Sequence, residues 1–99
     1  LHGTNGISLV VFTSVGCASC RAWKGILKDY LSINSEIMIF EVDAHESMAL
    51  ANEYEIFHLP ALFLFRDGEF HSALHSEANT EQVHRAIQHA LAAPAQEAP

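Results

Sequence analysis

The pattern of apolar and polar residues predicts seven elements, in the order strand, helix, strand, helix, strand, strand, helix. The first strand is an unbroken apolar run from Leu9 to Phe12, which is typical of a strand buried on both faces of a parallel sheet. After Cys20 the apolar spacing changes to three and four residues, which indicates an amphipathic helix. Its apolar positions are Trp23, Ile26, Leu27, Tyr30 and Leu31. Cys17 and Cys20 therefore lie where a strand leads into the start of a helix.

The remaining elements follow from the same kind of pattern. They are expected at residues 37–42 (strand), 44–54 (helix), 61–65 and 70–74 (strands), and in a last helix with the core positions Val83, Ala86, Ile87, Ala90 and Leu91. Asp43 or a near neighbour should cap the second helix, and Asn79 or Thr80 the last one. The Asp67-Gly68 pair predicts a hairpin, so the last two strands should be antiparallel. A right-handed crossover should make the first two strands parallel, which gives an α/β sandwich around a mixed four-stranded sheet.

Length and composition indicate one small domain. The chain has 99 residues, of which 49% are hydrophobic, and this suffices for a single core. We expect a flexible lead-in over residues 1–6, the domain over residues 7–92 and a disordered tail over residues 93–99. No apolar run reaches the ~18–20 residues of a membrane-spanning helix, so we expect a soluble, cytoplasmic protein, or a periplasmic one if an N-terminal signal has been removed.

The charge of the chain bears on its partners. The formal net charge is −7, and the five Lys and Arg residues do not form a basic cluster. Proteins that bind nucleic acid or anionic membranes usually present such a cluster. Neither is therefore expected as a partner.

The two cysteines carry the candidate chemistry. Unpaired backbone N–H groups and a partial positive charge at a helix N-terminus stabilise a thiolate over a thiol. Cys17 should therefore attack a foreign disulfide, and Cys20, three residues later, should resolve the mixed disulfide. Both cysteines belong to one motif, which favours a redox-active pair over a structural framework. A zinc site would need two further ligands, and no second cysteine pair exists.

The chain resembles the thioredoxin superfamily over almost its whole length. The segments that carry the resemblance are Val10-Val11-Phe12 before Cys17-Ala18-Ser19-Cys20, Val42-Asp43, residues 50–56, Leu59-Pro60 and residues 64–69. The resemblance implies a thioredoxin-like fold and a thiol–disulfide oxidoreductase that needs no cofactor or metal. It also implies that Pro60 is a cis proline facing the cysteines, beside which an extended protein substrate pairs. The residues expected to contact a substrate are Gly16, Ala18, Ser19, His58, Leu59 and Pro60.

The chain departs from the family pattern around the cysteines. Val11 stands where the family keeps a buried aspartate that relays protons to the resolving cysteine, and Ile39 replaces the lysine that accompanies it. Thr13 and Gly16 stand where tryptophans are usual. The proton acceptor for Cys20 and the surface that meets a substrate should therefore differ from the family pattern.

The family's usual first strand and helix are also absent before Ile7. If nothing precedes Leu1 in the native protein, the strand at residues 37–42 should lie at an edge of the sheet and carry an apolar run there. Such edges pair readily with other strands. We expect the N-terminal segment or a second copy of the chain, in a homodimer, to cover this edge.

Several side chains near the motif have a structural and a functional interpretation. Trp23 belongs to the apolar stripe of its helix, which favours a place in the core over substrate contact. His58, two residues before the proline, is a candidate for stabilising the thiolate or shuttling a proton. Glu41 is a weaker candidate for the missing base, because glutamates at strand ends are usually solvated. Ser19 is a candidate hydrogen-bond donor to Cys17. The spacing of the histidines predicts that they are solvated.

Two other functions stay open beside thiol–disulfide exchange. One is a redox-inactive module of the same fold that binds a partner in a groove between Cys17 and Pro60. The other is metal handling by Cys17 and Cys20 together with His58. The upstream reductant and the substrate are not encoded in any motif that we identify.

Overall fold

The computed structural model describes residues 6–99, so the lead-in predicted for residues 1–6 falls outside the described residues except for Gly6. The elements are β1 (Ile7–Thr13), α1 (Ala18–Ile33), β2 (Ile37–Asp43), α2 (Met48–Glu53), β3 (Ala61–Arg66), β4 (Glu69–Leu74) and α3 (Thr80–Ala92). This is the order that the hydrophobic pattern predicts.

The four strands form one mixed sheet in the order β2-β1-β3-β4. Strands β1 and β2 are parallel, with Ile7 opposite Ile37. The pairs β1–β3 and β3–β4 are antiparallel. Strand β1 therefore lies inside the sheet, where both faces of its apolar run are buried. The predicted fold class is confirmed, and β2 lies at an edge of the sheet as expected.

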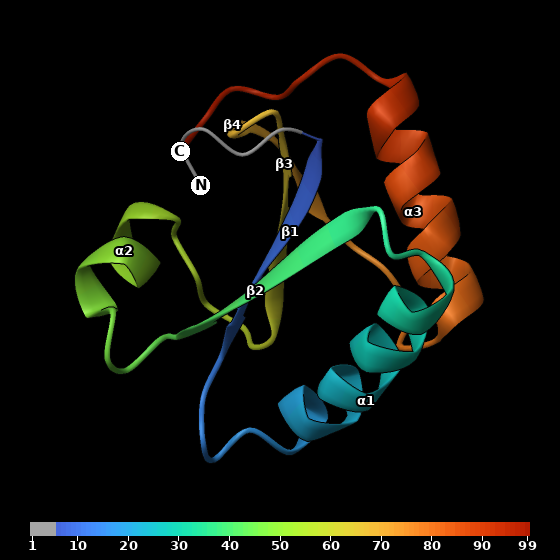
Figure 1. Ribbon diagram of the computed structural model, residues 1–99. Helices are drawn as coiled ribbons and strands as arrows, with labels where there is room; N and C mark the ends of the chain where they lie inside the picture. The colour runs from blue at the N-terminus through green and yellow to red at the C-terminus, as the bar shows by residue number, and fades with distance from the viewer. Residues whose placement is uncertain (1–5) are drawn as a thin grey trace.

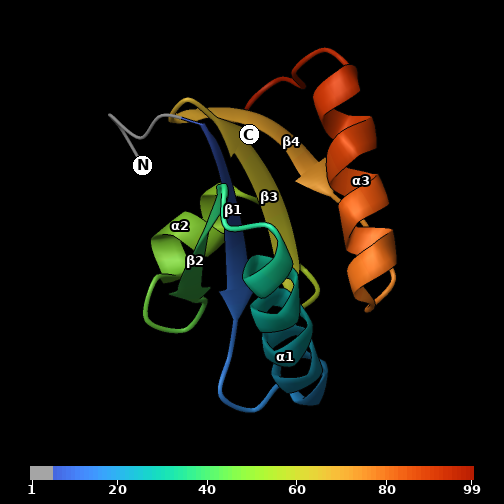
Figure 2. The same cartoon turned by 45° about the vertical axis from the view of Figure 1, so that its right-hand side comes forward.

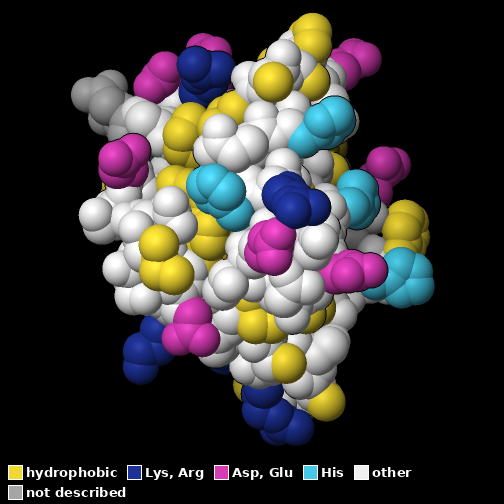
Figure 3. All heavy atoms as spheres, turned by 90° about the vertical axis from the view of Figure 1, so that its right-hand side faces the viewer, with side chains coloured by type: hydrophobic (Ala, Val, Ile, Leu, Met, Phe, Trp, Pro, Cys, Tyr) yellow, Lys and Arg dark blue, Asp and Glu magenta, His cyan; other side chains and the backbone are white. Residues whose placement is uncertain are grey.

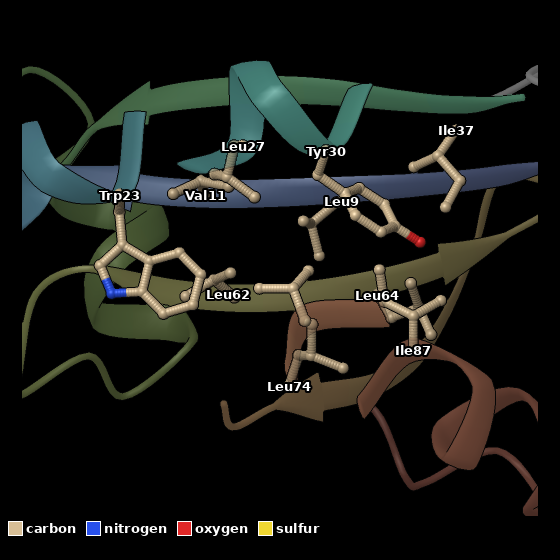
Figure 4. Packing of buried hydrophobic residues seen from close by; sticks show 11 residues of the cluster. Leu9, Val11, Trp23, Leu27, Tyr30, Ile37, Leu62, Leu64, Leu74 and Ile87 are labelled. Atoms are coloured by element: carbon tan, nitrogen blue, oxygen red, sulfur yellow. The ribbon is translucent and has the colours of Figure 1, made fainter. Parts of the chain in front are cut away.

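Helices cover both faces of this sheet. Helices α1 and α3 lie on one face, and α2 lies on the other (Figures 1 and 2). Under α1 and α3, side chains from the helices and the sheet interlock in one cluster (Figure 4). Trp23, predicted to be a core residue, lies in this cluster and is 7% exposed. Burial of these apolar faces, more than helix propensity, holds helices of this length in place.

The face under α2 has a smaller and more aromatic cluster. The rings of Phe12 and Phe63 meet edge to face, with centroids 5.8 Å apart, and Tyr54 packs edge to face against Phe63 at 4.9 Å. Edge-to-face contacts of this kind place the positive edge of one ring against the negative face of another. They attach the end of α2 to the sheet.

Helix α2 is shorter than the apolar stripe from residue 44 suggests. The carboxylate of Asp43 accepts hydrogen bonds from the backbone N–H groups of His45 (2.8 Å) and Glu46 (3.1 Å). These bonds hold the chain in a turn, and a short polar side chain commonly competes with helix formation in this way. The helix begins only at Met48, with Ser47 at the N-cap position.

The two edges of the sheet differ. At β4, the backbone N–H of Gln96 donates to the carbonyl of His71 (2.7 Å), and its side-chain carbonyl accepts from the N–H of Ala73 (3.2 Å). The segment expected to be a disordered tail thus contributes Gln96 to this edge, after the chain turns back from α3 (Figure 1). At the β2 edge, Met38 is 46% exposed.

The distribution of charged side chains on one face agrees with the expectation that the Lys and Arg residues are not clustered. On the face formed by α1 and α3, Lys and Arg side chains are dispersed among acidic, histidine and apolar side chains (Figure 3). Within residues 6–99, no helix combines the length and apolarity needed to span a bilayer.

Candidate active site

Cys17 occupies the N-cap of α1. Strand β1 ends at Thr13, and a turn closed by a hydrogen bond from the Cys17 N–H to the Ser14 carbonyl (3.2 Å) leads into the helix. The backbone of Cys17 is extended, and its sulfur accepts a hydrogen bond from the backbone N–H of Cys20 at 3.1 Å. A side chain that accepts from the third residue of a helix is the usual N-cap arrangement. The sulfur therefore takes the position that an anion prefers at a helix N-terminus.

The two cysteines form a disulfide, with their Cα atoms 5.2 Å apart. They differ in accessibility, because Cys17 is partly exposed whereas Cys20 is 1% exposed. Cys17 is thus the sulfur that an outside molecule can reach. The first turn of α1 contains no acidic residue, so no carboxylate offsets the positive end of the helix.

Ser19 connects Cys17 to the loop before β3. Its hydroxyl oxygen lies 3.3 Å from the Cys17 sulfur, and the hydroxyl donates to the Leu59 carbonyl at 3.2 Å. The peptide bond from Leu59 to Pro60 is cis. Of the predicted substrate contacts, the structure therefore brings Ser19 and Leu59 directly together beside the Cys17 sulfur. The sequence suggested Ser19 as a partner of Cys17 but gave no indication of its bond to Leu59.

The other predicted contact residues are more dispersed. Gly16, Ala18 and His58 are exposed. A cavity of about 400 Å³ is lined by His58 and Pro60 together with residues of β3 and β4, and neither cysteine lines it. Among the described residues, no hydrogen bond joins His58 to a cysteine. Among these residues, no hydrogen bond to a cysteine therefore supports the candidate role of His58.

A second cavity, of about 330 Å³, is lined by both Cys20 and Glu41. The Glu41 carboxylate accepts a hydrogen bond from the Thr13 hydroxyl (3.1 Å) and pairs with the Lys24 ammonium (3.1 Å). Its side chain is 48% exposed, which agrees with the solvated interpretation of this residue. Val11, at the position of the missing aspartate, is a core residue. Sequence reasoning missed Thr13 and Lys24 as partners of Glu41, because strand register and helix docking bring them together.

The histidines include one correction. His71 is buried, so the expectation that the histidines are solvated is wrong for it. Its Nε2 lies 2.6 Å from the Ala90 carbonyl near the end of α3, which supplies the hydrogen bond that a buried imidazole needs. His84 contacts the hydroxyl of Tyr30 at 3.0 Å. Burial raises the pKa of that hydroxyl above its ordinary value.

No group of three or more metal-ligating side chains lies close together within residues 6–99. The histidines thus form no ligand set of that size with the cysteines or carboxylates there. The arrangement that does stand out chemically is the sulfur pair at the start of α1.

Comparison with known proteins agrees with this geometry. The family model described as Thioredoxin matches residues 1–89. Thioredoxin H7 of Arabidopsis thaliana is 30% identical to the chain, over 70% of this chain and 54% of that protein. Protein disulfide isomerase-like 1-3 of the same plant is 29% identical, over 82% of this chain and 14% of that protein. The chain therefore spans less than two thirds of the length of either relative.

Solved structures show the same fold. The oxidized form of mitochondrial thioredoxin 3 from Saccharomyces cerevisiae superimposes with a TM-score of 0.75 and 21% identity, over 88% of this chain and 81% of that one. The family match covers both cysteines and all strands of the sheet. The chain belongs to the thioredoxin family.

Proposed function

We propose that this domain is a thiol–disulfide oxidoreductase that acts on protein disulfides. The observation that carries the proposal is the position of Cys17, a partly exposed residue at the N-cap of α1 whose sulfur accepts the Cys20 N–H at 3.1 Å. A thiolate there gains the charge-assisted hydrogen bond and the attraction of the helix N-terminus, both of which a neutral thiol largely forgoes. The pKa of the Cys17 thiol in the reduced protein is therefore expected to be lowered.

The reaction follows from the accessibility of the two sulfurs. The Cys17 thiolate attacks one sulfur of the partner disulfide, and the other partner sulfur leaves as a thiolate that takes up a proton. The Cys20 thiol then loses its proton and attacks Cys17, so that the bond between Cys17 and the partner breaks and the second partner thiol is released. Two electrons pass from the cysteine pair to the partner. An external thiol returns the pair to the reduced state, and the reverse sequence oxidises a dithiol partner.

The buried position of Cys20 supports this division of roles. A sulfur that is 1% exposed reacts with its neighbour far more readily than with a second protein. The name of the relative Protein disulfide isomerase-like 1-3 points to protein disulfides as the substrate class. The exposed surface beside Cys17, formed by Gly16 and Ala18, leaves room for a protein partner.

Insulin reduction tests the proposal. We expect the wild-type domain, with dithiothreitol as the recycling reductant, to precipitate reduced insulin faster than dithiothreitol alone, and Cys17→Ser to abolish the difference. The Cys20→Ser variant, reduced beforehand and freed of dithiothreitol, should instead accumulate a mixed disulfide with insulin, visible on a non-reducing gel. Absence of Cys17-dependent turnover and of the mixed disulfide would refute the proposal and favour a redox-inactive binding module. Metal retained stoichiometrically through purification would favour the metal-handling alternative.

The candidate role of His58 is tested in the same assay. Its place next to Leu59 in the loop before β3 is the observation that motivates the test. If His58 assists the thiolate or a proton transfer, His58→Ala should slow insulin reduction and change the pH dependence of Cys17 alkylation. Unchanged rates and an unchanged alkylation profile would show that His58 is only an exposed side chain.

We also propose that the β2 edge pairs with a strand of a second copy. Exposed Met38 lies on this edge, whereas Gln96 occupies the opposite edge at β4. Light scattering should then show a mass that rises with concentration, together with slow amide exchange over residues 37–42 in the dimer. A monomer at every concentration with fast exchange there would refute the pairing.

The cytoplasmic location stays a prediction, which cell fractionation would test.

A further inference from the structure

The hydroxyl of Ser19 faces two acceptors with a single proton. The Cys17 sulfur lies 3.3 Å from the hydroxyl oxygen, and the Leu59 carbonyl oxygen lies 3.2 Å from it. In the disulfide form Cys17 has no proton to donate, so any hydrogen bond between these side chains must come from the serine. A serine hydroxyl has one O–H donor. The two acceptors therefore compete for it.

The outcome of this competition depends on the charge of the sulfur. A disulfide sulfur is neutral and a weak acceptor, so the Leu59 carbonyl, 3.2 Å from the hydroxyl oxygen, is the preferred acceptor of the proton. A Cys17 thiolate is an anion, and hydrogen bonds to ionised acceptors are roughly twice as strong as neutral ones. Because both acceptors are already within hydrogen-bond distance, rotation of the O–H about the Cβ–Oγ bond redirects the proton without moving the side chain.

We propose that Ser19 is a positioning residue whose hydroxyl couples the redox state of Cys17 to the Leu59 carbonyl. In the oxidised protein the hydroxyl is bonded to Leu59 and ties the start of α1 to the loop before β3. In the reduced protein the hydroxyl turns to the Cys17 thiolate. The Leu59 carbonyl oxygen is then free to accept an N–H from an extended partner segment.

This coupling would order the steps of the reaction. The acceptor for the partner's backbone becomes available when Cys17 is a nucleophile, and it is occupied again once the disulfide has formed. A partner that is held partly through Leu59 therefore binds the reduced domain better and is released from the oxidised one. This consequence rests on the proposed function, whereas the hydroxyl reorientation itself requires only that Cys17 ionises.

Selective isotope labelling can report the Leu59 carbonyl directly. The sequence contains a single Leu-Pro pair, Leu59-Pro60. Protein labelled with carbonyl-¹³C leucine and ¹⁵N proline therefore shows one ¹³C resonance split by coupling to nitrogen, and that resonance belongs to Leu59. We expect it to move to lower frequency when the disulfide is reduced, because the carbonyl loses its hydrogen bond. In Ser19→Ala we expect the oxidised protein to resemble the reduced wild type, with little change on reduction.

Three variants, Ser19→Ala, Ser19→Thr and Ser32→Ala, separate the proposed coupling between Cys17 and Leu59 from a general structural effect. Ser19→Thr keeps a hydroxyl and should restore the redox-dependent shift. Ser32→Ala is the matched control, because Ser32 also lies in α1 and donates to a backbone carbonyl, that of Asp29, at 2.6 Å. It should behave as wild type. Arg21 and His58, the charged or titratable side chains nearest along the chain to Cys17 and Leu59, are unchanged in all three variants.

The thiol provides a second readout. Loss of the hydroxyl should raise the pKa of Cys17, measured from the pH dependence of alkylation, by about one unit, which is roughly a tenfold change in the ionisation constant. Ser32→Ala should leave this value unchanged. In insulin reduction at a pH where Cys17 is fully ionised, Ser19→Ala should lower kcat more than it changes KM. The reduced variant presents the same free Leu59 carbonyl as the reduced wild type, whereas the oxidised variant keeps that carbonyl free and releases the partner more slowly.

The outcomes distinguish this inference from the proposed function. If insulin reduction depends on Cys17 but the Leu59 resonance shifts alike on reduction in wild type and Ser19→Ala, the coupling is wrong and the proposed function stands. The coupling is also wrong if Ser19→Ala leaves the alkylation profile of Cys17 unaffected. A redox-dependent Leu59 shift that is lost in Ser19→Ala and restored in Ser19→Thr establishes the coupling, even if insulin is not a substrate.

Discussion

The preference of the α1 N-terminus for negative charge can be measured with a permanent anion in place of the Cys17 sulfur. Cys17→Asp places a carboxylate at the N-cap, and Cys17→Asn places a neutral side chain of nearly the same shape there. The Asn side chain can accept the same N-cap hydrogen bond as Asp, so the difference in stability between the two variants reports the charge. Neither variant can form the disulfide with Cys20, which is kept reduced in both.

The structure supplies two favourable interactions to such a charge. The backbone N–H of Cys20 donates to the side chain at position 17, and a hydrogen bond to a charged group is worth about 1 kcal/mol more than one to a neutral group. The positive end of α1, with no acidic residue in its first turn, adds ~0.3–1 kcal/mol. We expect Cys17→Asp to be more stable than Cys17→Asn by about 1–2 kcal/mol at neutral pH.

Urea unfolding followed by circular dichroism checks this value. The measurement is made in physiological salt, which screens the net charge of −7. The folded-state pKa of the new carboxyl should fall below its unfolded value of about 3.9. Its contribution is then present above that unfolded pKa and disappears as the pH falls through the folded pKa. Equal stability of the two variants at neutral pH, or an unchanged difference in acid, would refute the reasoning, because the helix would not favour an anion there.

Three further predictions concern the scaffold of the site. Leu64→Ala removes a fully buried side chain beneath α1 and α3 and should lower the free energy of unfolding in urea by ~2–5 kcal/mol. Leu64→Met nearly conserves the volume, so an equal loss of stability in that variant would contradict the packing explanation. Asn79→Ala removes the acceptor of the Gln82 N–H (2.8 Å) and should lower stability by about 1 kcal/mol and Tm by ~4–8 °C, while an unchanged Tm would show that this cap is dispensable. Burial raises the pKa of Tyr30, so its contribution to stability is present below the unfolded pKa of about 10 and is lost as the pH rises further. Tyr30→Phe should therefore lose less stability than wild type in alkaline unfolding, and an identical decline would be the contrary result.

Much of the fold was predictable because apolar periodicity is a property of neighbouring residues. Trp23 and Leu27 recur at helical spacing, and both face the core. The Asp67-Gly68 pair supplies the two positive φ angles of the β3–β4 turn, 52° and 82°, which is why this hairpin could be predicted. The start of α2 could not be predicted. The carboxylate of Asp43 accepts hydrogen bonds from the next backbone N–H groups and holds them in a turn, so the helix does not extend back by one more turn.

By itself, the sequence determined the order of the elements, the faces that α1 and α3 bury and the position of Cys17 at a helix start. These features depend on residues within a few positions of one another. Only the tertiary structure decided which polar groups meet. Ser19 and Leu59 are 40 residues apart, and Thr13 and Glu41 are 28 apart. Such contacts arise because packing of the apolar faces brings distant backbone segments within about 3 Å, the distance of a hydrogen bond, and no local pattern records the partner.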